Sequence, residues 1–305
     1  MSAVEEALGA IDRWVDDGAV KGVAAAVWSG DEIVATRHAG TRAPGQPVTN
    51  DTIFALASVS KPFTAAAVMS VLNAHDVDID TPLAEILPGF STVDDPFDPD
   101  LLPPLEALRE EITLRQALSH VSGLPENIGV RRIRMASMPS HDQLVDAMEQ
   151  VPLQSAPGEE LRYSNLGLGL ASRAAERIDG RPFHDILQAD ILDAMELDGV
   201  VLRPGKNEAG RIVHVDDAAG KGSPHESYNS EYWRQLAITW GGYYGSTSDV
   251  LRFAASFRPG DTGNPLPEAI RQKMVTDQTG GVPGGVNSAG LHWREGAWGL
   301  GWEVK

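Results

Sequence analysis

The sequence predicts an α/β (α+β) fold in which an antiparallel sheet is flanked by helices and carries an inserted, mainly helical lobe. Three observations predict this fold. The first residues show helical and then strand-like apolar patterns, the middle alternates helical segments with Pro- and Asp-rich connections, and Gly-rich, strand-like sequence returns from Thr239. The predicted sheet domain is therefore residues 1–75 together with 237–305, and the predicted helical lobe is residues 76–236.

The N-terminal elements follow from the spacing of apolar residues. Four apolar residues at helical spacing predict an amphipathic first helix: Val4, Leu8, Ile11 and Val15. Residues 22–28 and 32–38 are apolar, partly β-branched runs separated by a turn-like tripeptide, which predicts a β-hairpin. A buried helix is expected from close to Ser58 to Leu72, because this segment is small and apolar and Pro62 is tolerated only near a helix start.

The inserted lobe shows helical patterns and no run of strands. Its predicted helices cover residues 114–120, 141–151, 166–178 and 183–194. After the lobe we expect a Gly-rich strand, helices over 248–257 and 267–275, and one strand over 298–304.

Length and composition restrict the class of protein. At 305 residues the chain exceeds one typical domain, and its 42% hydrophobic and 22% charged residues exclude general disorder. The absence of cysteine excludes disulfide scaffolds, thiolate metal sites and a cysteine nucleophile. The net charge of -18 repels polyphosphates, so we expect no nucleic-acid partner.

No membrane partner is expected either. No uninterrupted apolar run reaches about 18 residues. The N-terminus, with Glu5, Glu6 and Asp12, lacks the basic-then-apolar pattern of a signal peptide. We therefore expect a cytoplasmic protein, whereas the sequence does not indicate its oligomeric state.

Ser58 and Lys61 form the one Ser-x-x-Lys spacing in the chain. This spacing places the hydroxyl and the amine on one turn at the positive end of the predicted helix. A buried Lys there loses its proton more easily and is able to accept one from Ser58. The alternative interpretation is a capping Ser beside an unrelated surface Lys, but the apolar sequence on both sides of Lys61 makes an incidental Lys costly.

Tyr163, Ser164 and Asn165 form a second polar group on a Gly-flanked segment. A Tyr phenol near Lys61 would transfer protons, and an Asn amide would bind a substrate carbonyl. By itself the tripeptide is structural more often than catalytic.

These two groups, in this order, resemble the serine β-lactamase-like superfamily, in particular the branch of class C β-lactamases, family VIII esterases and penicillin-binding proteins. Further segments agree with this resemblance over nearly the whole chain: 61–64, 80–83 with 87–88, 118–125, 241–242 with 246–249, and 299–302. The resemblance implies that Ser58 is the acylated nucleophile at the junction of the sheet domain and the helical lobe. It also implies that Lys61 and Tyr163 share the acid/base work and that Asn165 helps to bind the acyl group. No cofactor is expected. Which of Lys61 and Tyr163 is the base stays open.

The chain departs from the family pattern near its end. The family carries a third motif, Lys- or His-Thr/Ser-Gly, on a strand shortly after the Gly-Leu-Gly-Trp segment, whereas this sequence stops at Lys305. We therefore expect that the last strands and the C-terminal helix are missing and that the oxyanion hole lacks one donor. Gln278, Thr279 and Gly280 look similar to the motif but precede Gly299 in a loop-like stretch.

Other chemistry is less well supported. Residues 76–80 imitate the start of a calcium loop, but Thr81 stands where Gly is needed, and the His residues show no zinc-binding spacing, so no metal is predicted. His120 is expected to have a structural role near the site. Tyr243 and Tyr244 are typical of core residues, with pocket lining as the alternative.

The leading hypothesis is a serine hydrolase that forms an acyl-enzyme on Ser58 and hydrolyses a small ester or amide. A β-lactamase or a D-peptidase/transpeptidase would use the same residues, so a lactam substrate remains an alternative. A binding homologue that keeps the fold without turnover is the non-enzyme alternative.

Overall fold

The computed structural model describes residues 3–91, 93, 105, 107–129, 132–216, 225, 227–288, 291–293 and 296–304. The chain forms two compact units. The first consists of Met1–Ala57, Leu192–Ala237 and Gly242–Asn264, and the second of Ser58–Ile191, Ile238–Gly241 and Pro265–Lys305. The domains predicted from the sequence have other boundaries and stay a prediction. The predicted Asp- and Pro-rich connection at 94–100 lies outside the described residues.

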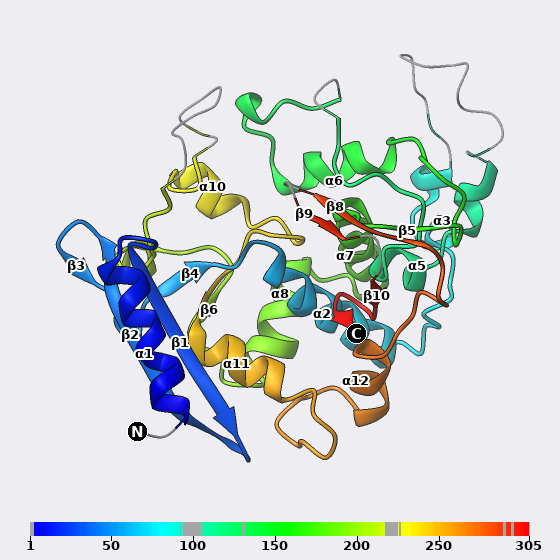
Figure 1. Cartoon of the computed structure of the whole chain (residues 1–305). Helices are drawn as coiled ribbons and strands as arrows, with labels where there is room; N and C mark the ends of the chain where they lie inside the picture. The colour runs from blue at the N-terminus through cyan, green and yellow to red at the C-terminus, as the bar shows by residue number, and fades with distance from the viewer. Residues whose placement is uncertain are drawn as a thin grey trace. The chain divides into compact units, whose positions relative to one another are not determined.

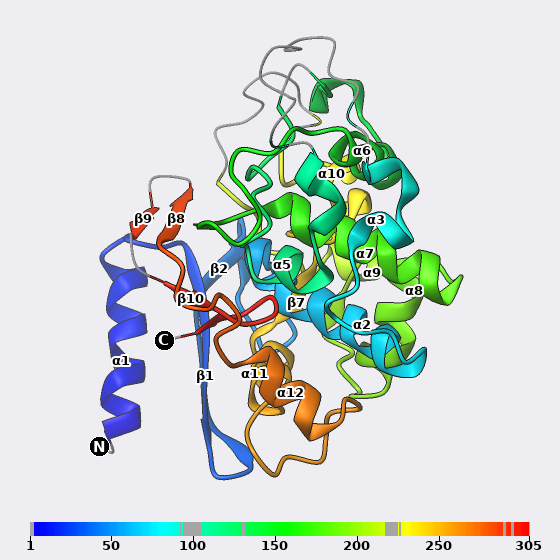
Figure 2. The ribbon, with the colours of Figure 1, turned by 90° about the vertical axis from the view of Figure 1, so that its right-hand side faces the viewer.

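The first unit contains the predicted N-terminal helix and hairpin. Helix α1 (Ala3–Asp16) lies along strands β1 (Gly22–Ser29) and β2 (Glu32–Ala43), as Figures 1 and 2 show from two directions. The two strands pair antiparallel, and the short strand β3 (Gln46–Pro47) extends the sheet beyond β2. Gly30 has a φ of 62° in the turn of the hairpin, a conformation that glycine adopts without strain. The predictions for this region are confirmed.

A second small sheet of the first unit has the order β4-β7-β6 (Ile53–Ala55, Tyr244–Ser246 and Val200–Val201). Tyr244 packs there with Ile53 and Ile212, and Tyr243 and Tyr244 are both buried, so their interpretation as core residues is confirmed. The other helices of this unit are α9 (Lys206–Ala209), α10 (Glu231–Leu236) and α11 (Thr247–Ala255).

Helix α2 (Ser60–Ala74) is the centre of the second unit and is buried on nearly every side. It begins two residues later than expected, because residues 57–59 form a separate 3₁₀ turn, η1 (Ala57–Val59). Helix α7 (Asn165–Asp179) packs against α2 and against α5 (Leu114–Leu118). A Cβ at Gly167 would lie 2.3 Å from the Ala117 carbonyl oxygen, so glycine permits the close approach of α7 to α5.

The described part of the second unit contains further helical elements. They are α3 (Leu83–Ile86), η2 (Pro88–Ser91), η3 (Ala107–Glu111), η4 (Met135–Ser137), α6 (His141–Glu149), α8 (Phe183–Leu187) and α12 (Glu268–Met274). The predicted helix over 183–194 is present as α8, followed by a wider π-helical segment, η5 (Gln188–Asp193).

The strand predicted over 298–304 is wrong as a single element. Two short antiparallel strands, β10 (Ala297–Trp298) and β11 (Glu303–Val304), are joined there by a turn. The Gly299 N–H donates to the Trp302 carbonyl at 2.8 Å, and Gly301 has a φ of 75°, so the chain reverses direction where the sequence suggested a continuous strand.

A three-stranded sheet in the second unit was not predicted. It consists of β5 (Leu161–Arg162), β8 (Gly284–Ser288) and β9 (Leu291–Trp293), with β5 parallel to β8 and β9 antiparallel to it. Its strands are short or Gly-rich and lack clear alternation, so the period-2 pattern that identifies strands is weak in them.

Candidate active site

Ser58 lies on η1, immediately before α2, and its side chain is exposed to solvent. The first residue of the helix is Ser60, and the capping position is Val59, which makes no side-chain cap bond. The hydroxyl of Ser58 therefore does not cap α2, and it accepts a hydrogen bond from Lys61 Nζ at 3.1 Å. The capping alternative is wrong for Ser58.

Lys61 lies in the first turn of α2 and is 1% exposed. Besides Ser58, its Nζ donates to the backbone carbonyl of Trp240 at 2.8 Å. A buried cation is costly unless it is paired. Burial lowers the pKa of Lys61 from 10.5 to about 7, and the negative charge of Glu126 opposes that shift. The amine is therefore poised to gain or lose a proton near neutral pH.

Tyr163 comes from a distant part of the chain and reaches the same point. It follows β5 and precedes α7, and its ring lies beneath Lys61 Nζ, 4.8 Å from the ring centroid. Burial raises the pKa of the Tyr163 phenol, and a hydrogen bond with Ser58 partly opposes this rise. Ser58 is thus in contact with both Lys61 and Tyr163.

His120 and Trp298 hold Tyr163 in place. The three rings form a cluster in which His120 lies 4.5 Å from Tyr163 and 4.5 Å from Trp298, centroid to centroid. The Nδ1 of His120 accepts the Ser164 N–H at 3.1 Å, which ties the ring to the backbone next to Tyr163. Burial and the nearby Lys61 lower the pKa of His120 to about 3, so it stays neutral. The structural role expected for His120 agrees with these contacts.

Asn165 is the first residue of α7, beyond Tyr163 and Ser164. Its backbone N–H donates to the Glu126 carbonyl at 3.0 Å, and its side-chain amide donates to Asn127 Oδ1 at 2.9 Å. These contacts fasten the start of α7 to residues 126–127. The structure places Asn165 one residue beyond the Ser164 cap of α7, and its proposed acyl-binding role remains a prediction.

The turn between β10 and β11 supports α2 at Lys61. The Gly301 N–H donates to the Leu118 carbonyl at 2.9 Å. A Cβ at Gly301 would lie 2.6 Å from the Ala65 Cβ and 3.0 Å from the Lys61 carbonyl oxygen. The glycine therefore permits direct packing of this turn on the helix that carries Lys61.

The tripeptide 278–280 lies in the loop after α12 and not on a strand. The Gln278 N–H donates to the Trp298 carbonyl at 2.7 Å, whereas the Thr279 hydroxyl donates to Asp277 at 2.6 Å. Nothing in these contacts directs the Thr279 side chain at Ser58, and a role of this tripeptide in an oxyanion hole stays a prediction.

Two partners of the site have no motif in the sequence. Trp240 contributes only its backbone carbonyl to Lys61, and Glu126 contributes charge from a loop. A backbone group leaves no trace in residue type. The sequence offered one indication of Glu126, namely its position directly after the 118–125 segment.

The described residues hold no group of three or more His, Cys, Asp or Glu side chains positioned to hold a metal ion. In the same part of the chain, no helix is both long enough and apolar enough to cross a membrane. At the site itself, the Ser58 hydroxyl lies between a buried amine and a phenol, an arrangement suited to nucleophilic catalysis.

Comparison with known proteins places this geometry in context. The family model described as Beta-lactamase matches residues 3–305. Esterase EstB from Burkholderia gladioli is 28% identical over 95% of this chain and 76% of the esterase. The D-alanyl-D-alanine-carboxypeptidase/endopeptidase AmpH from Escherichia coli K12 is 24% identical over 93% of this chain and 72% of its own length. The solved structure of a D-amino acid amidase from Ochrobactrum anthropi SV3 has the same fold, with a TM-score of 0.72 and 23% identity over 99% of this chain and 81% of the amidase.

Proposed function

This chain belongs to the beta-lactamase family, and from that premise we propose that it is a serine hydrolase that forms an acyl-enzyme on Ser58. The observation that carries the proposal is the contact of the exposed Ser58 hydroxyl with the buried Lys61 amine, at 3.1 Å. A hydroxyl becomes a useful nucleophile when an adjacent base takes its proton.

Lys61 is the base in this proposal and Tyr163 is the proton donor. With a pKa of about 7, a substantial fraction of Lys61 is neutral at neutral pH. The raised pKa of Tyr163 keeps its phenol protonated in the same range. The two environments shift the two groups in directions that suit these opposite roles.

In the proposed acylation, each change in bonding at the substrate is accompanied by a proton transfer. Ser58 Oγ attacks the carbonyl carbon of the substrate, and the Ser58 proton passes to Lys61 Nζ. Tyr163 gives its phenolic proton to the departing alcohol or amine, and the Lys61 ammonium returns a proton to the phenolate. In deacylation, water attacks the acyl carbon and gives a proton to Lys61 Nζ. The bond between the acyl carbon and Ser58 Oγ then breaks, Lys61 returns the proton to Oγ, and the carboxylic acid leaves.

A small ester or amide is the proposed substrate. Support comes from the relative EstB, whose name is that of an esterase. The same residues would open a β-lactam or a D-alanyl peptide bond, and the substrate test below decides between them. A cytoplasmic location likewise stays a prediction, to be tested by cell fractionation.

The test is a substrate panel run with matched variants. Purified chain is assayed with a short-chain nitrophenyl ester, a chromogenic cephalosporin and a D-alanyl peptide, beside Ser58→Ala and Lys61→Ala. We expect ester hydrolysis that is lost with Ser58→Ala and falls by about two orders of magnitude or more with Lys61→Ala. Turnover of the cephalosporin or peptide alone would assign the chain to the alternative substrate class, and equal rates for wild type and Ser58→Ala would overturn the proposal.

A further inference from the structure

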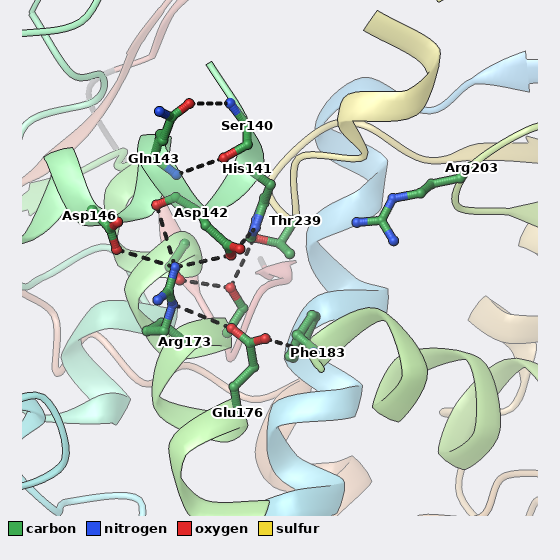
Figure 3. A network of polar contacts seen from close by, with 12 residues as sticks. Ser140, His141, Asp142, Gln143, Asp146, Arg173, Glu176, Phe183, Arg203 and Thr239 are labelled. Atoms are coloured by element: carbon green, nitrogen blue, oxygen red, sulfur yellow. Dashed lines mark hydrogen bonds and ion pairs between the residues drawn. The ribbon is translucent and has the colours of Figure 1, made fainter. Parts of the chain in front are cut away.

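Thr239 is fully buried and lies in the short segment Ile238–Gly241, which belongs to the second unit. Its hydroxyl lies 3.1 Å from Ser172 Oγ on α7 and 3.4 Å from His141 Nε2 on α6. Figure 3 shows Thr239 and His141 facing each other in this network. One side chain therefore contacts two helices of the unit.

The direction of these hydrogen bonds follows from their partners. Ser172 Oγ donates its proton to the Gly169 carbonyl at 2.7 Å, so it can only accept from Thr239. The Thr239 oxygen is then the acceptor for His141 Nε2, which sets the His141 tautomer. The Thr239 hydroxyl thus uses its one donor and one of its two acceptor lone pairs, which restricts its rotamer.

The Thr239 backbone is bound as well. Its carbonyl accepts a hydrogen bond from Thr64 Oγ1 at 2.5 Å, and Thr64 lies on α2 three residues after Lys61. The next residue along the chain is Trp240, whose carbonyl accepts from Lys61 Nζ at 2.8 Å. The network thus ends on the amine of the candidate site.

The helices that hold Thr239 are fastened to each other. His141 is the first residue of α6, after a reciprocal cap between Ser140 and Gln143. Arg173 on α7 lies 3.2 Å from Asp142 and 3.4 Å from Asp146, and its side chain is 13% exposed. These ion pairs link α7 to α6 next to His141 (Figure 3).

We propose that Thr239 is a positioning residue for acylation: its hydroxyl, held by Ser172 and His141, keeps the Trp240 carbonyl against Lys61 Nζ. This inference rests on the proposed function of Ser58 and Lys61. A neutral amine has two N–H bonds and one lone pair. Binding one N–H to a fixed carbonyl restricts the rotation of Nζ and keeps the lone pair available to the Ser58 hydroxyl.

Loss of this restraint has a predictable direction. The Trp240 carbonyl stabilises the ammonium form of Lys61, so a displaced carbonyl lowers the pKa of Lys61 further. The other groups that face Lys61 are Glu126, His120 and Tyr163, and none of them is bound to Thr239 by the contacts described. A substitution that removes the Thr239 hydroxyl therefore tests the connection from Thr239 through the Trp240 carbonyl to Lys61.

The experiment compares Thr239→Val, which keeps the shape and removes the hydroxyl, with Thr239→Ser, which keeps the hydroxyl. The control is Thr52→Val, the same substitution at a buried Thr whose hydroxyl accepts the Thr49 N–H at 2.8 Å in the first unit. The rate of fluorophosphonate labelling of Ser58 is measured against pH. For Thr239→Val we expect labelling about tenfold slower at its maximum and an acidic midpoint lower by about half a pH unit. Thr239→Ser and Thr52→Val should keep the wild-type midpoint.

A second measurement follows the protonation of Lys61 directly and does not depend on acylation of Ser58. The chain is labelled with ¹³C-lysine, the Lys61 signal is assigned with Lys61→Arg, and its titration is followed by NMR in wild type and Thr239→Val. If Thr239→Val does not fold, Ser172→Ala replaces it, with a shift in the same direction expected. Wild-type titration of Lys61 in a folded variant would overturn the inference. Absence of Ser58 labelling in the wild type would instead overturn the proposed function, and the NMR titration would still decide the role of Thr239.

Discussion

Lys61 Nζ lies 3.1 Å from Ser58 Oγ, yet Lys61 is 1% exposed whereas Ser58 faces solvent. This contrast is what gives the pair its chemical value. The amine loses its hydration and hence part of its affinity for a proton, while the hydroxyl remains accessible to a substrate.

Ser58 is expected to be the residue that becomes acylated. Incubation with a fluorophosphonate and peptide mapping by mass spectrometry should find the adduct on Ser58, because it combines exposure with the Lys61 contact. Ser60→Ala is the neighbouring control, since Ser60 is fully buried in α2. An adduct on Ser60 or Ser122 with Ser58 unmodified would contradict the assignment.

Lys61→Met is expected to stabilise the fold while it abolishes activity. The native pKa of about 7 lies below the 10.5 of an exposed Lys, so between these values the unfolded chain binds a proton that the native chain does not. Stability therefore rises with pH through this window, by about 1.4 kcal/mol for each unit between the two pKa values. Below about pH 7, Lys61 is protonated in both the native and the unfolded chain, so the native state bears the full free-energy cost of burying its charge. Urea unfolding at several pH values should show that Lys61→Met raises the free energy of unfolding most at or below pH 7. This increase should become smaller towards pH 10.5. Lys206→Met, at an exposed Lys, should show no such trend, and a constant gain at every pH would contradict the assigned pKa.

Glu126→Gln is expected to move the acidic limb of the pH–rate profile to lower pH. The Glu126 charge favours the ammonium form of Lys61, so its removal lowers the pKa of Lys61 and leaves more neutral amine in acid. A shift of roughly half a unit is expected in acylation rate against pH. Glu303→Gln is the matched control, because the Glu303 charge acts on Tyr163. A shift to higher pH would show that the limb belongs to another group.

Tyr163→Phe is expected to affect substrates according to their leaving group. If Tyr163 protonates the departing atom, an alkyl ester should lose about 100-fold in rate, whereas a nitrophenyl ester, whose leaving group needs no proton, should lose far less. Tyr228→Phe, at a Tyr that is 46% exposed, serves as the control. Equal losses on both esters would assign Tyr163 a role other than proton donation.

Gly301→Ala is expected to destabilise the protein more than Gly180→Ala. Both glycines have positive φ, 75° and 86°, so both substitutions strain the backbone. Only at Gly301 does the added Cβ also meet other atoms, 2.6 Å from the Ala65 Cβ, whereas Gly180 has open space. Thermal unfolding should place Gly301→Ala below Gly180→Ala, with a cost of about 2 kcal/mol or more. Equal melting temperatures would show that the turn does not press on α2.

The sequence was sufficient for elements whose signal is local. The helical spacing of apolar residues predicted α1, the two β-branched runs predicted the β1–β2 hairpin, and the small apolar segment predicted α2. The Ser58–Lys61 contact is also local, because η1 leads directly into α2 and residues three apart lie close together across this junction. The same reasoning failed for residues 297–304, where the turn at Gly301 depends on its contact with α2.

The tertiary structure alone decided the chemistry of that contact. Whether Lys61 is an exposed ammonium or a buried amine depends on α7, the Tyr163 ring and the Trp240 carbonyl, which come from segments about a hundred or more residues away. Spacing along the chain specifies which side chains share a turn. Desolvation and hydrogen bonding by distant segments set the pKa, because both depend on the atoms that surround a group in space and not on its neighbours in sequence.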